Sequence, residues 1–161
     1  LGRREADIAL RPTSRPPEGL LGRKIGIIAS CIYAAIDYRG PDGSAEDWST
    51  MDWIGPDSPA YIPELDRWMF ERGVDRRVIY RVNTWLGMQE AVRCGLGVAV
   101  LPRYLCDPDE ALRRLGGPIP ELEMELWLLT HPDLRRVGRI QFFMEFMGGA
   151  IRSRLRAFPS R

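Results

Sequence analysis

Residues 78–102, Val-Ile-Tyr-Arg-Val-Asn-Thr-Trp-Leu-Gly-Met-Gln-Glu-Ala-Val-Arg-Cys-Gly-Leu-Gly-Val-Ala-Val-Leu-Pro, carry the pattern that decides the fold class. Residues 78–82 read as a strand, and Asn83 or Thr84 can cap the helix that follows. Gly95 ends that helix, and residues 97–101 form a second apolar strand. Strand, helix and strand at these lengths predict a parallel, right-handed βαβ unit, so the fold class is α/β.

The segments on the N-terminal side fit the same class. Residues 6–10 look like a short apolar strand, and residues 24–36 form a longer apolar stretch that reads as a buried strand and its continuation. Residues 37–63 are acidic and rich in Gly and Pro, which predicts irregular connections anchored by Trp48 and Trp53. A short helix is expected over residues 65–71, with Gly73 as its C-cap.

Three elements are expected on the C-terminal side. Asp107-Pro108-Asp109-Glu110 has the residues of a helix start, which predicts a short helix through Leu115. Residues 124–131 form a strand whose middle is apolar on both faces, as in central parallel strands. One long amphipathic helix is predicted by apolar residues at steps of three and four, namely Leu134, Val137, Ile140, Met144, Met147, Ile151 and Leu155.

Composition excludes several protein classes. The chain has 161 residues, of which 45% are hydrophobic and 28% are charged, as in a soluble globular protein. The longest apolar run stops at Asp37, far short of the roughly 18 to 20 residues that span a bilayer. No export signal is visible, so we expect a cytoplasmic protein without membrane contact.

Cysteine, histidine and charge point away from metals and nucleic acids. Three widely spaced cysteines fit reduced thiols, and a single histidine, His131, leaves too few ligands for zinc, so no metal site is expected. The net charge of +1 hides ten acids between residues 37 and 75 and seven arginines after residue 134. The overall balance shows no nucleic-acid footprint.

We find no catalytic constellation and expect no cofactor. Gly95-Leu96-Gly97 lies between a helix and the next strand, whereas a dinucleotide fingerprint needs glycines between a strand and the next helix. His131 precedes Pro132 at a strand-to-helix turn, so a turn residue is the favoured interpretation over a member of a serine triad. Asp107 and Asp109 are better explained by capping than by acid–base chemistry.

The helix start at Asn83-Thr84-Trp85 is a candidate anion site. It follows a strand directly, so free backbone N–H groups and the positive end of the helix dipole face the space beyond the sheet. The alternative is structural, with Asn83 and Thr84 as caps and Trp85 in the core. Arg11 and Arg103 each follow the end of a predicted strand, where ligands of open α/β sheets bind.

An ordered set of segments resembles the effector-binding region of LysR-type transcriptional regulators. The set comprises Arg4-Glu5-Ala6-Asp7-Ile8-Ala9-Leu10-Arg11, Gly22-Arg23-Lys24-Ile25-Gly26, residues 82–87, residues 91–102, Leu126-Trp127-Leu128-Leu129-Thr130-His131-Pro132-Asp133 and the arginine-rich final helix. No single motif is diagnostic, but together they span nearly the whole chain in the order of the family.

The resemblance implies a type II periplasmic-binding-protein-like fold, with a small-molecule inducer held in a cleft between two Rossmann-like lobes. Lobe I would comprise residues 1–29 and 125–161, and lobe II residues 30–124, with crossovers at 24–29 and 123–128. The residues that would line the cleft are Arg11, Thr13, Asn83, Thr84, Trp85, Pro102 and Arg103. The inducer is expected to be anionic or polar.

The family pattern also includes parts that this sequence does not show. The winged helix-turn-helix and the first part of lobe I are missing, so DNA is expected to bind only through a domain absent from this chain. The resemblance therefore implies a non-enzymatic sensor. A homodimer or homotetramer is expected, because the strand at residues 6–10 and the apolar stripe of the final helix would otherwise lack neighbours that cover them. The alternative is a solute-binding protein or an enzyme on the same bilobal fold.

Overall fold

The computed structural model describes residues 6–40, 47–58 and 62–158. Contacts within the chain divide it into two compact units, which are described one at a time. Unit 1 is formed by Leu1–Ile28 and Glu123–Ser160, and unit 2 by Ala29–Leu122. In the described part of the chain, no helix is both long and apolar enough to cross a membrane.

Unit 1 is built on a three-stranded antiparallel sheet in the order β1-β8-β2. Its strands are β1 (Ile8–Pro12), β2 (Leu21–Ile28) and β8 (Met124–Thr130). The expectation that residues 124–131 run parallel to their neighbours is wrong, because both flanking strands pair with β8 in antiparallel register. Its central position alone explains why β8 is apolar on both faces.

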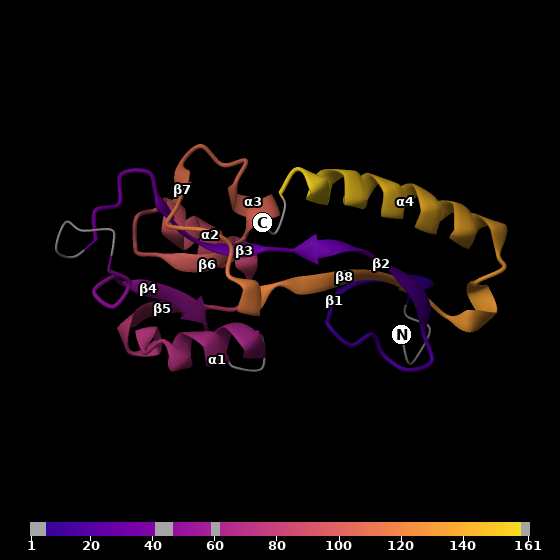
Figure 1. Cartoon of the computed structure of the whole chain (residues 1–161), viewed down its shortest axis with the longest axis horizontal. Helices are drawn as coiled ribbons and strands as arrows, with labels where there is room; N and C mark the ends of the chain where they lie inside the picture. Colours follow the sequence, from indigo (N-terminus) through magenta and orange to yellow (C-terminus); the bar gives the residue numbers. More distant parts are fainter. Residues whose placement is uncertain (1–5, 41–46, 59–61, 159–161) are drawn as a thin grey trace. The chain divides into compact units, whose positions relative to one another are not determined.

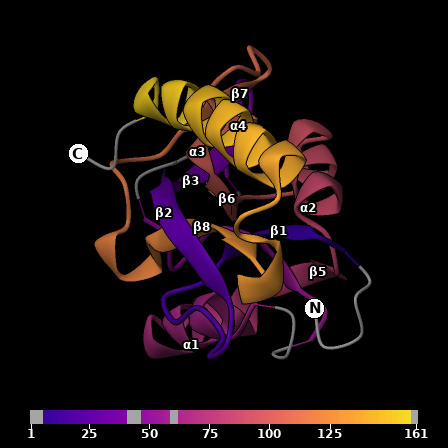
Figure 2. The same ribbon diagram turned by 90° about the vertical axis from the view of Figure 1, so that its right-hand side faces the viewer.

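The long amphipathic helix is confirmed as α4 (Gly138–Arg156), which follows the 3-10 turn η3 (Pro132–Leu134). Ile140 is buried, and the other apolar residues of the predicted stripe are half-buried. The helix runs alongside the sheet of unit 1 (Figures 1 and 2). Gly26 of β2 leaves room for this packing, since a Cβ there would lie 2.5 Å from Leu155 Cδ1.

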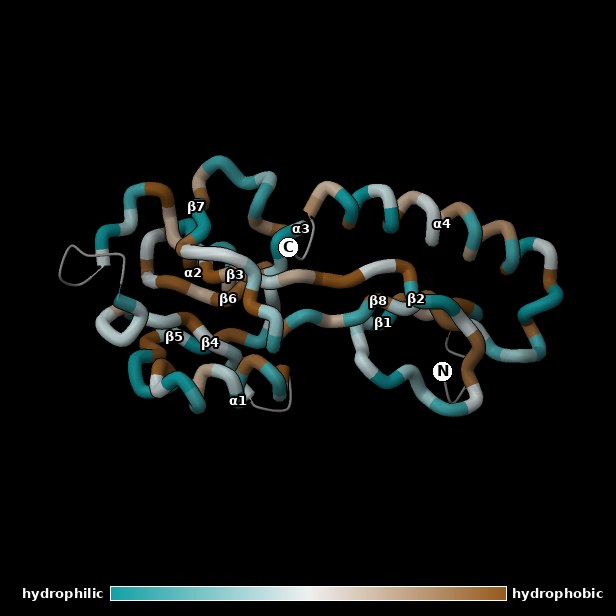
Figure 3. The backbone as a smooth tube through the Cα atoms, in the orientation of Figure 1, coloured by the Kyte–Doolittle hydropathy of each residue, from teal (hydrophilic) through white to brown (hydrophobic). Residues whose placement is uncertain are grey.

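Unit 2 contains a buried central strand, β3 (Ser30–Ala35), between β6 (Ala99–Pro102) and β7 (Leu112–Arg114). Both neighbours are antiparallel to β3. Tyr33 is only 1% exposed, and Figure 3 shows hydrophobic (brown) colouring along the neighbouring strand β6.

A parallel pair extends this arrangement. Strands β4 (Trp53–Pro56) and β5 (Val78–Val82) pair in parallel, and Trp53 also forms a parallel bridge with Val98, just before β6. Strands β5 and β6 therefore run in the same direction with β4 between them, which confirms the parallel direction predicted for residues 78–102. Strand β4 lies where only irregular chain was expected, because Gly55 and Pro56 hide its pattern.

Two predicted helices of unit 2 are confirmed. Helix α1 (Pro63–Glu71) is followed by Gly73 in the left-handed region at φ 70°, whose N–H donates to Phe70 O at 3.0 Å. The 3-10 turn η1 (Val74–Arg77) leads from there to β5. Helix α2 (Trp85–Arg93) ends before Gly95, which has φ 74°.

The helix predicted for residues 107–115 is wrong. The helical residues are α3 (Arg103–Cys106), which ends before Asp107, whereas Leu112–Arg114 form β7 on the edge of β3. The Asp109 carboxylate accepts the N–H of Ala111 at 3.1 Å and so closes a turn instead of starting a helix. Pairing of Leu112–Arg114 with the edge of β3, a strand distant in sequence, therefore prevails over the helix that the local residues favour. The short turn η2 (Pro120–Leu122) then ends unit 2.

Candidate functional site

Thr84 caps the start of α2, as the sequence predicts. Its backbone is extended, with φ −139° and ψ 145°, and its Oγ1 accepts the N–H of Gly87 at 3.0 Å. The N–H of Met88 donates to Thr84 O at 3.0 Å. The first N–H groups of a helix lack intrahelical acceptors, and those of Trp85 and Leu86 have no acceptor among the described residues, so they remain available.

Gly87 makes this cap possible. A Cβ at residue 87 would lie 2.6 Å from Val82 Cγ2 and 2.9 Å from Thr84 Oγ1. A side chain there would therefore push the Thr84 hydroxyl away from the helix start. The hydroxyl, which uses one acceptor lone pair on Gly87, keeps its hydrogen free to donate to a ligand.

The neighbours of Thr84 differ in exposure. Asn83 and Thr84 are exposed, whereas Trp85 is half-buried and packs against the core of unit 2. Leu86 is 67% exposed beside them. The helix start thus presents polar groups to solvent on a support fixed by Trp85.

Pro102 and Arg103 are buried in unit 2, so their side chains face protein atoms. The Arg103 guanidinium pairs with Asp107 through two contacts of 3.0 Å, from Nε and from a terminal nitrogen, and its backbone N–H donates to Ala29 O. Asp107 also accepts a hydrogen bond of 2.5 Å from the Tyr33 hydroxyl. Arg103 is therefore engaged inside the unit and ties α3 to β3.

The thiols beside this network are held in the protonated form. Burial raises the pKa of Cys106 to about 12, and the Asp109 and Asp107 carboxylates add to the rise. Burial also raises the pKa of Cys31 against the opposing effect of Arg103. A protonated, buried thiol is a poor nucleophile, so neither cysteine is suited to thiol chemistry.

In unit 1 the sequence-predicted residues lie at the end of β1. Arg11 was expected just past that strand, but it lies within the strand, opposite Trp127, and is exposed. The Thr13 N–H donates to Glu125 O at 2.8 Å. The Thr13 hydroxyl donates to Arg15 O at 2.9 Å, so its hydrogen is already used in a local turn.

Sequence reasoning missed a polar cluster on the same sheet. Lys24 donates to the Glu125 carboxylate at 2.5 Å, and Trp127 Nε1 donates to the same carboxylate at 3.0 Å. These hydrogen bonds, the one from Lys24 first, lower the pKa of Glu125. The only lysine of the chain was the available signal. Lys24 on β2 and Arg11 on β1 both lie opposite Trp127 of β8, and this placement depends on strand register.

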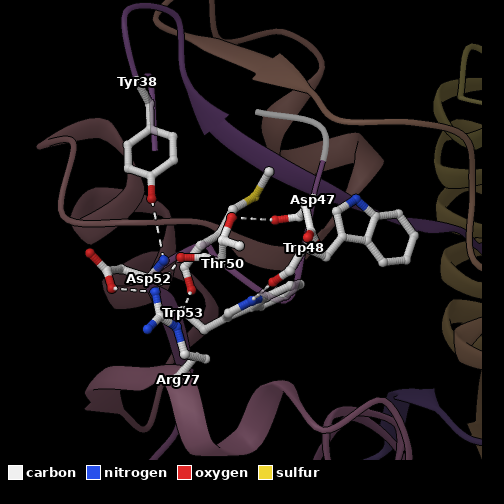
Figure 4. A network of polar contacts seen from close by, with 8 residues as sticks. Tyr38, Asp47, Trp48, Thr50, Asp52, Trp53 and Arg77 are labelled. Carbon is white, nitrogen blue, oxygen red and sulfur yellow. Dashed lines mark hydrogen bonds and ion pairs between the residues drawn. The ribbon is translucent and has the colours of Figure 1, made fainter. Parts of the chain in front are cut away.

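A second polar network fixes the approach to β4 (Figure 4). Arg77 donates to the carbonyls of Thr50 and Met51 and lies 3.8 Å from an Asp52 oxygen. Trp53 Nε1 donates to Trp48 O at 2.9 Å, which confirms the anchoring role expected for these two tryptophans. The contacts of the network join its own residues to one another, so it reads as structural support.

The described residues contain no group of three or more His, Cys, Asp or Glu side chains placed to hold a metal ion. His131 is exposed and accepts the N–H of Asp133 at 3.3 Å as the cap of η3, which confirms its interpretation as a turn residue.

A model of the LysR substrate binding domain matches residues 1–152. The chain belongs to this family. It is the effector-binding domain of a LysR-type transcriptional regulator, and the type II periplasmic-binding-protein-like fold expected from the sequence is confirmed. No curated protein matches the chain.

Solved structures agree on the fold of this LysR domain. The CrgA regulatory domain from Neisseria meningitidis is 19% identical with a TM-score of 0.70, and the match covers 93% of this chain and 78% of that one. A structure of CrgA from the same organism matches at 18% identity with a TM-score of 0.75, over 93% of this chain and 54% of that one. The CcmR regulatory domain from Synechocystis PCC6803, in complex with 2-PG, is 15% identical with a TM-score of 0.68, over 92% of this chain and 75% of that one.

Proposed function

We propose that this LysR domain senses a small anionic or polar effector that binds at the start of α2. The observation that carries the proposal is Thr84, an exposed residue at the positive end of the helix whose hydroxyl oxygen accepts the Gly87 N–H and whose hydrogen can therefore be donated to a ligand. Asn83 and Trp85 flank this donor set. Arg11 and Thr13 of unit 1 are proposed to supply the remaining contacts.

Arg103 and Pro102 have a supporting role in this proposal. The Arg103 guanidinium is paired with Asp107, and this pairing positions α3 and the end of β6 at the rim of the proposed site, where Pro102 and Arg103 are placed. The same proposal divides the binding residues between units 1 and 2, which would correspond to the two lobes of the family. Effector occupancy would then shift the balance between two arrangements of the protein.

The test is calorimetric titration of the intact protein, with 2-PG and a panel of small carboxylates as probes. Thr84→Val removes the donor and should weaken binding by about 1 to 3 kcal/mol, the scale of a hydrogen bond to a charged group. Thr84→Ser keeps the hydroxyl and should restore affinity. Arg11→Ala should weaken binding similarly, and the exposed Arg15→Ala is its matched control.

A solute-binding protein or an enzyme on the same fold is the competing function. Turnover of a bound probe would favour an enzyme, whereas unchanged affinity in both Thr84→Val and Arg11→Ala would remove these residues from the site. We further propose a cytoplasmic, non-enzymatic homodimer or homotetramer that contacts DNA through a domain outside this chain. Light scattering, and gel shifts with and without that domain, test these points.

A further inference from the structure

Unit 1 contains a cavity of about 440 Å³ bounded by the first residues of β2, the end of β8 and one side of α4. Its polar lining comes from Arg23, Thr130, Arg135, Gln141 and Glu145. None of these residues belongs to the proposed effector site. The volume lies in the range of about 300 to 1,000 Å³ that is usual for small-molecule sites.

The charged groups that line this cavity have no ionic partner in the part of the chain that the structure describes. Among the described residues, none forms an ion pair with Arg23, Arg135 or Glu145. The contrast with Lys24 is direct, because that residue adjoins Arg23 in sequence and is paired with Glu125. Guanidinium groups without a carboxylate partner match the geometry of carboxylate and phosphate ligands.

Arg23 is held in place at the cavity wall. One terminal nitrogen donates to the Met144 carbonyl at 2.5 Å, and the guanidinium lies against Gly148. Its Nε is buried and has no hydrogen-bond partner among the described residues. A guanidinium that is already ordered loses little further entropy on binding, which favours affinity.

We propose that this cavity binds a small organic anion, a carboxylate or a phosphate, that also carries a hydrogen-bond donor. The anionic group pairs with Arg23 and Arg135, and the donor, a hydroxyl or ammonium group, faces the Glu145 carboxylate. Hydroxy acids and amino acids meet both conditions. Dianions with a second carboxylate meet repulsion from Glu145, so the site discriminates against them.

The experiment uses the intact protein with three probes, glycolate, L-serine and inorganic phosphate, in calorimetric titrations. Hydrogen–deuterium exchange then locates the binding. We expect at least one probe to protect residues 20–24 and 138–146, and to leave residues 83–88 unchanged. If phosphate is the only probe that gives this pattern, the cavity is a phosphate site. If glycolate or serine gives it, the cavity is a carboxylate site.

Paired variants test the residues. Arg135→Ala should weaken binding about tenfold or more, whereas Arg136→Ala, an equally exposed neighbour outside the lining, should change affinity less than about twofold. Glu145→Gln should weaken serine and glycolate binding and admit malonate. An unchanged melting temperature shows that the variants fold.

Several results would overturn the proposal. Equal affinities in Arg135→Ala and Arg136→Ala would remove Arg135 from any site, and binding that Glu145→Gln leaves unchanged would do the same for Glu145. The absence of protection at residues 20–24 with all three probes would show that the cavity binds none of them. Protection confined to residues 83–88 would support the effector site at Thr84 and contradict this second site.

Discussion

The Arg23 guanidinium lies directly against Gly148, in the middle of α4. A Cβ at residue 148 would lie 2.6 Å from a terminal nitrogen of Arg23 and 3.2 Å from its Nε. That nitrogen donates to the Met144 carbonyl one turn earlier in the helix. The absence of a side chain at residue 148 is therefore what allows β2 and α4 to share this contact.

Gly148→Ala should destabilise the protein, although Gly-to-Ala changes inside helices usually stabilise by up to about 1 kcal/mol. The new methyl group displaces the end of the Arg23 side chain and breaks its hydrogen bond to the Met144 carbonyl, a loss of about 1.5 to 3 kcal/mol for a charged donor. Gly149→Ala is the matched control, because a Cβ there meets nothing within 4 Å. Urea denaturation should show opposite signs for the two variants. If both variants are stabilised, the Arg23 packing is incorrect.

Local signals predicted most of the fold. Several features depend only on residues within one or two helical turns: the cap at Thr84, the helix ends at Gly73 and Gly95, and the apolar stripe of α4. The direction of β8 could not be predicted, since a central strand is apolar on both faces whether its neighbours are parallel or antiparallel. The error at residues 107–115 has a similar cause, because the edge of β3 lies about 80 residues away in sequence.

The candidate site was predictable only in part. The free donors at Thr84 follow from a strand that leads directly into a helix, so the sequence was sufficient. The pairing of Arg103 with Asp107 had a signal in the four-residue spacing of opposite charges, which a helix or a turn brings together. The placement of Arg23 against Gly148 had no signal in the sequence, because it joins residues that are 125 positions apart.

Thiol accessibility should separate the three cysteines. Cys94 is exposed, whereas Cys31 is 0% exposed and Cys106 is 1% exposed. We expect one thiol per chain to react rapidly with a disulfide reagent in the native state, and three after denaturation. Cys94→Ser should abolish the rapid reaction. Rapid modification of Cys31 or Cys106 in that variant would contradict the buried network around Asp107.

Stability should fall at alkaline pH. The folded state keeps the proton of Cys106 until about pH 12, whereas the unfolded chain releases it near the ordinary value of 9.0. Between these values the unfolded state binds fewer protons, so the free energy of unfolding decreases as pH rises, by up to about 1.4 kcal/mol per pH unit for this group. Burial raises the pKa of Cys31 and Tyr33 as well, which acts in the same direction.

Denaturation from pH 8 to pH 11 measures this dependence. Cys106→Ala removes one of the groups, so its free energy of unfolding should decline less steeply with pH than that of the unaltered protein. The exposed Cys94→Ala is the matched control. Equal slopes for the unaltered protein and Cys106→Ala would show that the Cys106 thiol ionises in the folded state as it does in the unfolded chain.

The junction between β4 and β6 should be sensitive to a single methyl group at Gly97. A Cβ there would lie 2.4 Å from Asp52 O, the acceptor of the Val98 N–H at 2.8 Å. The Asp52 atoms that this Cβ would meet, the carbonyl oxygen and carbon, belong to the backbone, so the clash is relieved only if the two strands separate. The neighbouring hydrogen bond from Ile54 N to Val98 O then weakens too. Overpacking together with loss of buried hydrogen bonds predicts a destabilisation of about 2 to 5 kcal/mol for Gly97→Ala.

Gly117→Ala is the control for this prediction, since a Cβ at residue 117 meets nothing within 4 Å and should change stability by less than about 0.5 kcal/mol. Urea denaturation with tryptophan fluorescence is a suitable measurement, because the fully buried Trp53 lies at the junction itself. Since β4 joins β5 to β6, its displacement should also move Val82, which contacts Gly87 at the start of α2. A Gly97→Ala variant as stable as Gly117→Ala would mean that β4 does not hydrogen-bond beside β6, and that Thr84 is positioned without this junction.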